Sequence, residues 1–315
     1  MEGDRTASVK IPGQIKLDEE RIRLIAEKHG APMAGFLLPE PLEDCLEILE
    51  QRRGQGRYTE FEGRDPAVRT DFRNFYPKAE TVIVIGVPYP FIQKQPAPVA
   101  ALFRGEDYHR RIRRIMTEIV GELKQIDPGL KARCSVDNPR LVDRWSAWRA
   151  GLGFFGRNNL LISPEYGSFF NIGQILINRR IPFQTVHPLN NHCGSCRACL
   201  DACPAGALEQ GLTLIPERCQ SYLTQKKILT EPEEAMITDS ITGCDRCQLV
   251  CPWNLRAAEK LGEKAGIRES ELPALTIREA ADLTDEAWHH QFDDSCASWL
   301  SPEIIRRNAG ILLKK

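Results

Sequence analysis

Eight of the eleven cysteines fall between residues 193 and 252, at spacings that suit metal–sulfur chemistry. The first run has the pattern C-x2-C-x2-C-x3-C-P, the second has C-x2-C-x3-C-P, and one cysteine stands alone between them. Thiolates are soft ligands, which zinc and iron–sulfur clusters prefer. The cysteines are Cys193, Cys196, Cys199 and Cys203 in the first run, Cys219 alone, and Cys244, Cys247 and Cys251 in the second run.

This spacing predicts two 4Fe–4S clusters. In the bacterial two-cluster pattern, the fourth cysteine of a run ligates the other cluster. Two zinc sites of four cysteines each are the alternative, but zinc rarely uses three cysteines in C-x2-C-x2-C. Such clusters carry single electrons, so the substrate chemistry must lie elsewhere in the chain. The expected ligand sets are Cys193, Cys196, Cys199 and Cys251 for one cluster, and Cys203, Cys219, Cys244 and Cys247 for the other.

Length and charge limit the classes of protein that this chain can be. Its 315 residues, 42% of them hydrophobic, favour two domains with a substantial core. The formal net charge of −1 gives no global basic field, so any RNA contact must be a local patch. Cysteines at cluster spacing indicate a reducing compartment. Since we find neither a signal-peptide core nor an apolar run of about 18 residues, we expect a cytoplasmic protein without membrane contact.

The front domain, residues 1–182, must position the reacting groups. The β-branched run 79–89 predicts a strand buried on both faces, with helices on either side of a sheet. Residues 108–126 carry the clearest helical stripe, and the arginine-rich opposite face is either solvated or a phosphate-contacting patch. A second strand at 130–136 would deliver Asp137 at its end.

The other expected elements follow from the same patterns. Residues 183–258 should form the cluster domain, and 259–315 a short helical C-terminal extension. We expect helices at 18–29, 41–52, 141–150, 256–264, 277–281, 284–291 and 303–313, a long loop at 53–77, and a strand pair formed by 160–162 and 169–178.

Several segments together resemble the epoxyqueuosine reductases, relatives of the reductive dehalogenases. The resemblance runs from about residue 20 to the C-terminal residue. The segments are GEDYH at 105–109, Val136-Asp137 with Asp143-Arg144 behind it, AGLGFFG at 150–156, GSFF at 167–170, CQSYLT at 219–224 and GCDRCQLVCPWN at 243–254.

The resemblance implies an α+β fold, in which a nitroreductase-like three-layer domain binds base-off cobalamin beside a ferredoxin-like domain with two 4Fe–4S clusters. It implies an oxidoreductase of queuosine biosynthesis that reduces an epoxide in tRNA to an alkene, with loss of water. Electrons from an external low-potential donor would pass through the clusters to cobalt, and Co(I) would attack the epoxide. We expect a monomer.

The resemblance also implies the site residues. Asp137 is the expected proton donor, whereas the residues alone suggest a turn residue at a strand end. In a closed pocket, desolvation should raise the pKa of this carboxyl so that it holds a proton near neutral pH. The expected cobalamin contacts are Arg69, Asp137, Asn158, Leu161, Ile172, Ser221, Cys244 and Asp245.

Two other functions fit the same residues. One is a related cobalamin and iron–sulfur reductase that acts on a small epoxide or an organohalide. The other is an electron-transfer or corrinoid-activating protein without substrate chemistry of its own.

Overall fold

The computed structural model describes residues 17–63, 65–89, 98–137, 140–209, 213–261 and 275–315. Within these residues, no helix combines the length and the apolar character needed to cross a membrane. The front half holds α1 (Glu19–Lys28), β1 (Met33–Leu37), α2 (Glu43–Gly54), η1 (Glu60–Glu62), α3 (Pro66–Arg69), α4 (Phe72–Phe75), β2 (Thr81–Pro88), η2 (Ala101–Phe103), α5 (Tyr108–Ile126), β3 (Ala132–Val136), α6 (Asp143–Arg149), β4 (Phe154–Phe155), β5 (Leu161–Ile162) and β6 (Phe170–Ile177). The second half holds α7 (Ala198–Asp201), β7 (Leu208–Glu209), β8 (Thr213–Leu214), η3 (Pro216–Arg218), α8 (Gln220–Leu223), α9 (Glu231–Met236), α10 (Arg246–Leu249), α11 (Pro252–Leu261), α12 (Ile277–Ala281), α13 (Asp285–Phe292) and α14 (Pro302–Leu313).

Four antiparallel strands form the central sheet, in the order β1-β2-β6-β3. β2 lies inside the sheet and is buried from Thr81 to Val87, so the predicted doubly buried strand is confirmed. β6 pairs with β2 on one side and with β3 on the other. β3 ends at Val136, and Asp137 therefore leaves the sheet at this edge.

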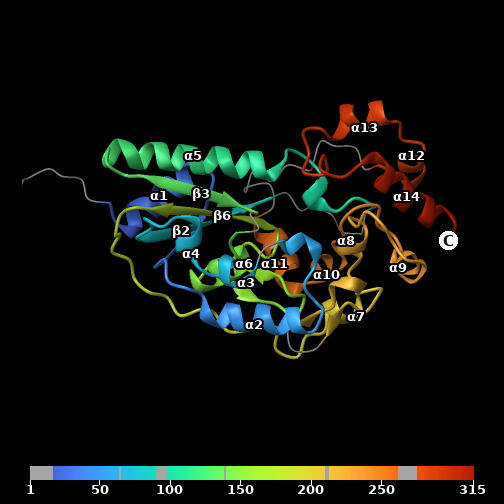
Figure 1. Cartoon of the computed structure of the whole chain (residues 1–315), viewed down its shortest axis with the longest axis horizontal. Coiled ribbons are helices and arrows are strands. Elements are labelled where there is room, and N and C mark those ends of the chain that lie inside the picture. Colours follow the sequence, from blue (N-terminus) through green and yellow to red (C-terminus); the bar gives the residue numbers. More distant parts are fainter. Residues whose placement is uncertain (1–16, 64, 90–97, 138–139, 210–212, 262–274) are drawn as a thin grey trace, which may run out of the picture.

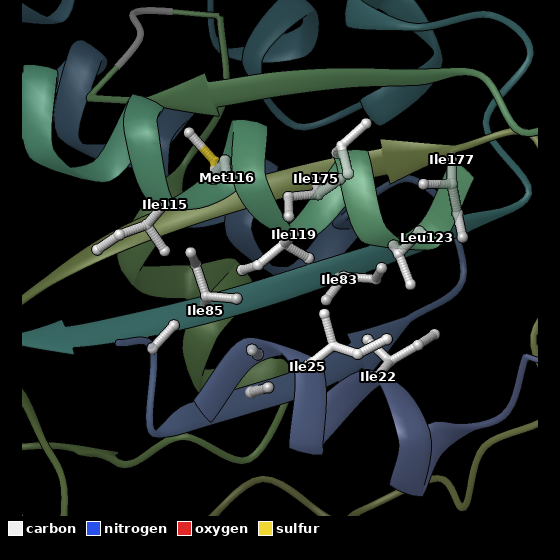
Figure 2. Packing of buried hydrophobic residues seen from close by; sticks show 14 of the residues in the cluster. Ile22, Ile25, Ile83, Ile85, Ile115, Met116, Ile119, Leu123, Ile175 and Ile177 are labelled. Carbon is white, nitrogen blue, oxygen red and sulfur yellow. The ribbon is translucent and has the colours of Figure 1, made fainter. Parts of the chain in front are cut away.

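Helices cover both faces of the sheet, which gives three layers (Figure 1). On one face, α1 and α5 share a core with Ile83 and Ile85, and Ile119 of α5 lies over them (Figure 2). On the other face, α2, α4 and α6 pack on Val82 and Val84. Alternate side chains of β2 thus enter opposite cores, as the pleat of a strand requires. The predicted helix at 108–126 is confirmed with the same bounds.

The cysteine runs fold into short turns of helix. α7 and α10 have four residues each, and they contact each other. Each begins inside a cysteine run, because closely spaced ligands require the chain to curl within one helical turn. α11 follows directly after Cys251, and the part of its predicted range at 262–264 lies outside the described residues.

A buried polar junction connects the front domain to the cluster domain. Ser168 N–H donates to Asn254 Oδ1 at 2.6 Å, and Ser168 Oγ donates to Gln248 Oε1 at 2.8 Å. Asn254 Nδ2 donates to the carbonyl of Gln248 at 2.8 Å. Gly167 has a φ of +67°, and an added Cβ there would lie 2.3 Å from Asn254 Oδ1. Glycine is therefore required next to this junction.

The C-terminal helices share a core with residues from both earlier parts of the chain. Trp288, Ile305 and Ala309 belong to the same buried cluster as Phe103 from the front domain and Ile241 from the cluster domain. Asn308, fully buried on α14, donates to the carbonyls of residues 224 and 241 at 2.8 and 2.7 Å. The C-terminal segment is thus packed into the body of the protein, at the right of Figure 1.

Two predictions about local structure are wrong, and one strand was missed. β5 pairs with β4, whereas 160–162 was expected to pair with 169–178. Only an isolated bridge joins Ser163 to Gly167 at the expected turn. Residues 53–77, expected to be a loop, contain η1, α3 and α4, because caps such as Asp65 and Asp71 start single helical turns there. Strand β1 was not predicted at all.

Candidate functional site

The cluster cysteines line two separate cavities in the structure. The first thiol cavity, of about 90 Å³, is lined by Cys193, Cys196, Cys199 and Cys251. The second thiol cavity, of about 350 Å³, is lined by Cys203, Cys219, Cys244 and Cys247. This partition coincides with the two predicted ligand sets, including the exchange of Cys203 and Cys251 between the runs. Among the described residues, no three His, Cys, Asp or Glu side chains converge as the ligands of a single metal ion would.

Burial favours the protonated thiol at several of these cysteines, among them Cys199 and Cys247. Burial, followed by the charges of the neighbouring thiols Cys193, Cys251 and Cys196, raises the pKa of Cys199 to about 11. Burial raises the pKa of Cys247 as well, and Cys199 is among the charges that contribute. The two thiol cavities are therefore adjacent. Binding a cluster would release these protons, since the thiolate is the ligand.

A third cavity lies at the sheet edge where β3 ends. This Asp137 cavity, of about 570 Å³, is lined by Asp137, Tyr108 and His109, and by residues from the cluster domain and the C-terminal segment. It is contiguous with the second thiol cavity. Six residues line both of them: Leu102, Phe103, Arg144, Phe170, Asn171 and Ser221.

Asp137 sits in a network with the first turn of α5. Tyr108 donates its hydroxyl proton to Asp137 Oδ2, and His109 Nε2 lies 3.4 Å from the same oxygen. The other ring nitrogen of His109, Nδ1, is 2.8 Å from Asp107 Oδ1, which also accepts the His109 backbone N–H. Asp107 thereby caps α5 and orients the imidazole toward Asp137. Asp137 itself has a φ of +41°, which is uncommon outside glycine and turns the carboxyl back toward α5.

The expectation of a raised pKa for Asp137 is wrong in this structure. The hydrogen bond from His109 lowers its pKa and outweighs desolvation, and Tyr108 lowers it further. Burial works against the charged form of His109, but hydrogen bonds to Asp137 and Asp107 raise its pKa overall. Asp137 is therefore ionised at neutral pH, and the carboxyls of Asp137 and Asp107 favour the protonated form of the His109 imidazole.

Asp143 is the second carboxyl group of the Asp137 cavity. Gln174 Nε2 donates to Asp143 Oδ1, and the backbone of Asp137 also hydrogen-bonds to this carboxyl. Burial, followed by the charge of Asp137, raises the pKa of Asp143 to about 7. Gln174 Oε1 is buried and has no hydrogen-bond partner among the described residues. A protonated Asp143 carboxyl would supply the hydrogen-bond donor that this oxygen lacks.

We expect Asp143→Asn to stabilise the protein relative to the wild type, and increasingly so as the pH rises from about 5.5 to about 8.5. An acid whose pKa is raised in the folded state contributes stability that is fully present below its unfolded pKa of 3.8. That stability falls as the pH rises toward the folded pKa of about 7, and it changes little above that pH. Asparagine keeps the shape of the neutral acid and does not ionise. Midpoints of anaerobic urea unfolding at both pH values would measure the difference. Asp294→Asn, at a side chain that is 93% exposed, is the matched control. An Asp143→Asn effect of equal size at both pH values would contradict this assignment.

The structure places most of the predicted cobalamin contacts around the two joined cavities. Arg69, Asp137 and Ile172 line the Asp137 cavity, Asn158, Cys244 and Asp245 line the second thiol cavity, and Ser221 lines both. Leu161 lines neither, because its side chain is buried in the core beneath α6.

Sequence reasoning missed Gln174 and assigned no role to Asp143, Tyr108 or His109, although these three belong to the segments that carry the family resemblance. Tyr108 and His109 lay within the family motif and directly after a helix cap, which was an available signal. Gln174 had none, because only the pairing of β3 with β6 brings its strand to this edge.

Comparisons with known proteins agree with this geometry. The profile of the family described as "Epoxyqueuosine reductase QueG, DUF1730" matches residues 69–138, which end just after Asp137. The profile described as "4Fe-4S double cluster binding domain" matches residues 192–254 and covers all eight cluster cysteines. A curated epoxyqueuosine reductase from Listeria monocytogenes is 32% identical over 308 residues, covering 94% of this chain and 80% of the relative. The chain belongs to the epoxyqueuosine reductase family.

Solved epoxyqueuosine reductases share the fold as well. The enzyme from Streptococcus thermophilus superposes with a TM-score of 0.80 at 30% identity, covering 93% of this chain and 80% of that one. An epoxyqueuosine reductase crystallised with an epoxyqueuosine-modified stem loop of tyrosine tRNA gives a TM-score of 0.83 at 29% identity, with the same coverage. The mixed α and β architecture with an iron–sulfur domain is thus the architecture of this family, and the family is one of oxidoreductases.

Proposed function

We propose that this protein reduces the epoxide of epoxyqueuosine in tRNA, which yields the alkene of queuosine and water. The curated relatives named for this reaction and the solved complex with a modified tRNA stem loop support the substrate. The observation that carries the proposal is the common wall of the Asp137 cavity and the second thiol cavity. The cysteines that would hold a cluster and the carboxyl groups that would hold protons therefore line one joined space.

We further propose two 4Fe–4S clusters, held by the two cysteine sets, and base-off cobalamin in the joined cavities. Arg69 Nε and Asn158 Nδ2 are buried donors without a partner among the described residues, and both residues line these cavities. Cobalamin carries amide oxygens around its ring, and these would satisfy such donors. When bound, reduced cobalamin supplies a strongly nucleophilic cobalt, and the clusters relay single electrons from an external low-potential donor.

The chain's own residues supply and direct protons. Converting an epoxide to an alkene and water consumes two electrons and two protons. The His109–Asp137 pair holds one proton beside the cavity, and Asp107 keeps the imidazole aligned. Transfer of that proton from His109 Nε2 to Asp137 Oδ2 would make Asp137 the acid that faces the substrate oxygen. Asp143, whose pKa is about 7, holds a second proton in the same cavity.

Anaerobic reconstitution tests this function directly. The protein would be loaded with iron, sulfide and cobalamin, and supplied with a chemical reductant and a stem-loop RNA that carries epoxyqueuosine. We expect mass spectrometry to detect queuosine only when cobalamin is included. Turnover of a small epoxide or an organohalide without turnover of the RNA would favour the small-molecule reductase instead. Reduction of the clusters without turnover of any substrate would favour an electron-transfer protein.

A further inference from the structure

Three aromatic side chains form a contiguous cluster at the opening of the Asp137 cavity. We call Phe61, Tyr222 and Trp299 the rim cluster. The centre of the Phe61 ring lies 5.3 Å from the centre of the Tyr222 ring and 5.6 Å from that of the Trp299 ring. The ring planes meet at 75° and 87°, so both contacts are edge-to-face. Phe61 and Trp299 line the same cavity as Asp137, yet they are 43% and 53% exposed. Large aromatic rings that are exposed together at a cavity mark a ligand-binding surface.

The rim cluster is held in place by three distant parts of the chain. Phe61 lies in η1, Tyr222 in α8 of the cluster domain, and Trp299 between α13 and α14. Tyr222 donates its hydroxyl proton to Glu60 at 2.7 Å, which joins the front domain to the cluster domain at this point. Glu62, in the same η1 turn, pairs with Arg52 and Arg69 at 3.0 and 3.3 Å. The rings are thus fixed before any ligand arrives, which lowers the entropic cost of binding.

Charge around the rim cluster is mixed. Lys226 lies 5.9 Å from the centre of the Tyr222 ring, but it pairs with Glu233 at 2.6 Å. The negative charges of Glu60, Glu217 and Glu233 also act on Tyr222. A surface of this kind does not attract phosphate strongly. A flat, uncharged group that stacks on aromatic rings would suit this surface better than a phosphate.

Unpaired RNA bases are such groups. Proteins read RNA loops mainly by splaying bases out and stacking them on aromatic side chains. We propose that the rim cluster stacks an unpaired base next to the modified nucleotide of the RNA substrate, while the modified side chain reaches inward to Asp137. This inference rests on the proposed function and deepens it, since it assigns the residues that recognise the loop around the reacting nucleotide.

A cycle of protein and RNA variants tests the stacking. We expect the holoenzyme with Trp299→Ala or Phe61→Ala to bind an epoxyqueuosine stem loop about 5- to 100-fold more weakly than the wild type, the range that one base–aromatic stack supplies. Trp299→Phe should restore most of the affinity. The slope of log Kd against log salt should stay unchanged, because no charge is removed. Fluorescence anisotropy would measure each Kd.

RNAs that lack one base beside the modified nucleotide identify the stacked base. One abasic RNA should bind wild type and Trp299→Ala equally, because the partner of the ring is already gone. Leu24→Ala, at a residue that is 60% exposed on α1, is the control and should bind like the wild type. If Trp299→Ala binds the intact RNA like the wild type, or weakens every abasic RNA equally, the stacking proposal is overturned. Failure of the wild-type holoenzyme to bind or reduce the RNA would instead overturn the proposed function.

Discussion

Asp137→Asn is expected to lower kcat for epoxide reduction about 10²- to 10⁴-fold, the usual contribution of a positioned general acid. The amide has the size of the carboxyl and can still accept hydrogen bonds from Tyr108 and His109. It cannot pass a proton to the departing oxygen. We expect KM for the RNA to change little, because binding does not use this proton.

The measurement must separate lost chemistry from lost cofactors. Iron content and the visible corrinoid spectrum of Asp137→Asn should match those of the wild type. Asp294→Asn, which makes the same chemical change at an exposed residue of the C-terminal segment, should retain full kcat. Near-wild-type turnover by a fully loaded Asp137→Asn enzyme would show that the acid is another group, with Asp143 and His109 as the remaining candidates.

Single and double cysteine-to-serine variants should reveal which cysteines bind the same cluster. Each single substitution is expected to remove about half of the bound iron and to abolish detectable reduction, because one broken relay stops electron flow. Cys203→Ser with Cys219→Ser should lose no more iron than either alone, since both thiols line the second cavity. Cys199→Ser with Cys203→Ser should lose nearly all of it, although these two cysteines belong to one run.

Chemical iron analysis of anaerobically purified variants is the readout. Cys134→Ser is the matched control, because its thiol lies on β3, away from both thiol cavities, and should leave iron at the wild-type level. If Cys199→Ser with Cys203→Ser kept half of the iron, each run would serve its own cluster and the crossed assignment would be wrong.

Sequence patterns predicted those helices and strands that are determined by neighbouring residues along the chain. The helix at Tyr108–Ile126 was predicted with the observed bounds, because its apolar stripe runs over many turns and Asp107 caps its start. The continuous apolar run through Val84 identified a strand covered on both faces. The cysteine spacing gave the same two sets that line the thiol cavities, since ligand loops are short and depend little on the rest of the fold.

Features that depend on distant pairing were beyond the reach of sequence patterns. β4 and β5 have two residues each, too few to show a period, so their pairing went unseen. The pKa direction of Asp137 was predicted wrongly because burial was considered without the partners that α5 brings to the end of β3. Asp143 and Gln174 lie 31 positions apart along the chain and meet only once the sheet has formed.

The buried junction of Ser168, Gln248 and Asn254 has a consequence for how turnover is controlled. Polar groups buried this completely are costly to pull apart, so the iron–sulfur module cannot swing away between catalytic cycles. In the proposed enzyme, the distance between the clusters and the Asp137 cavity would therefore be set when the protein folds. Arrival of the RNA, rather than a hinge motion, would then start electron transfer.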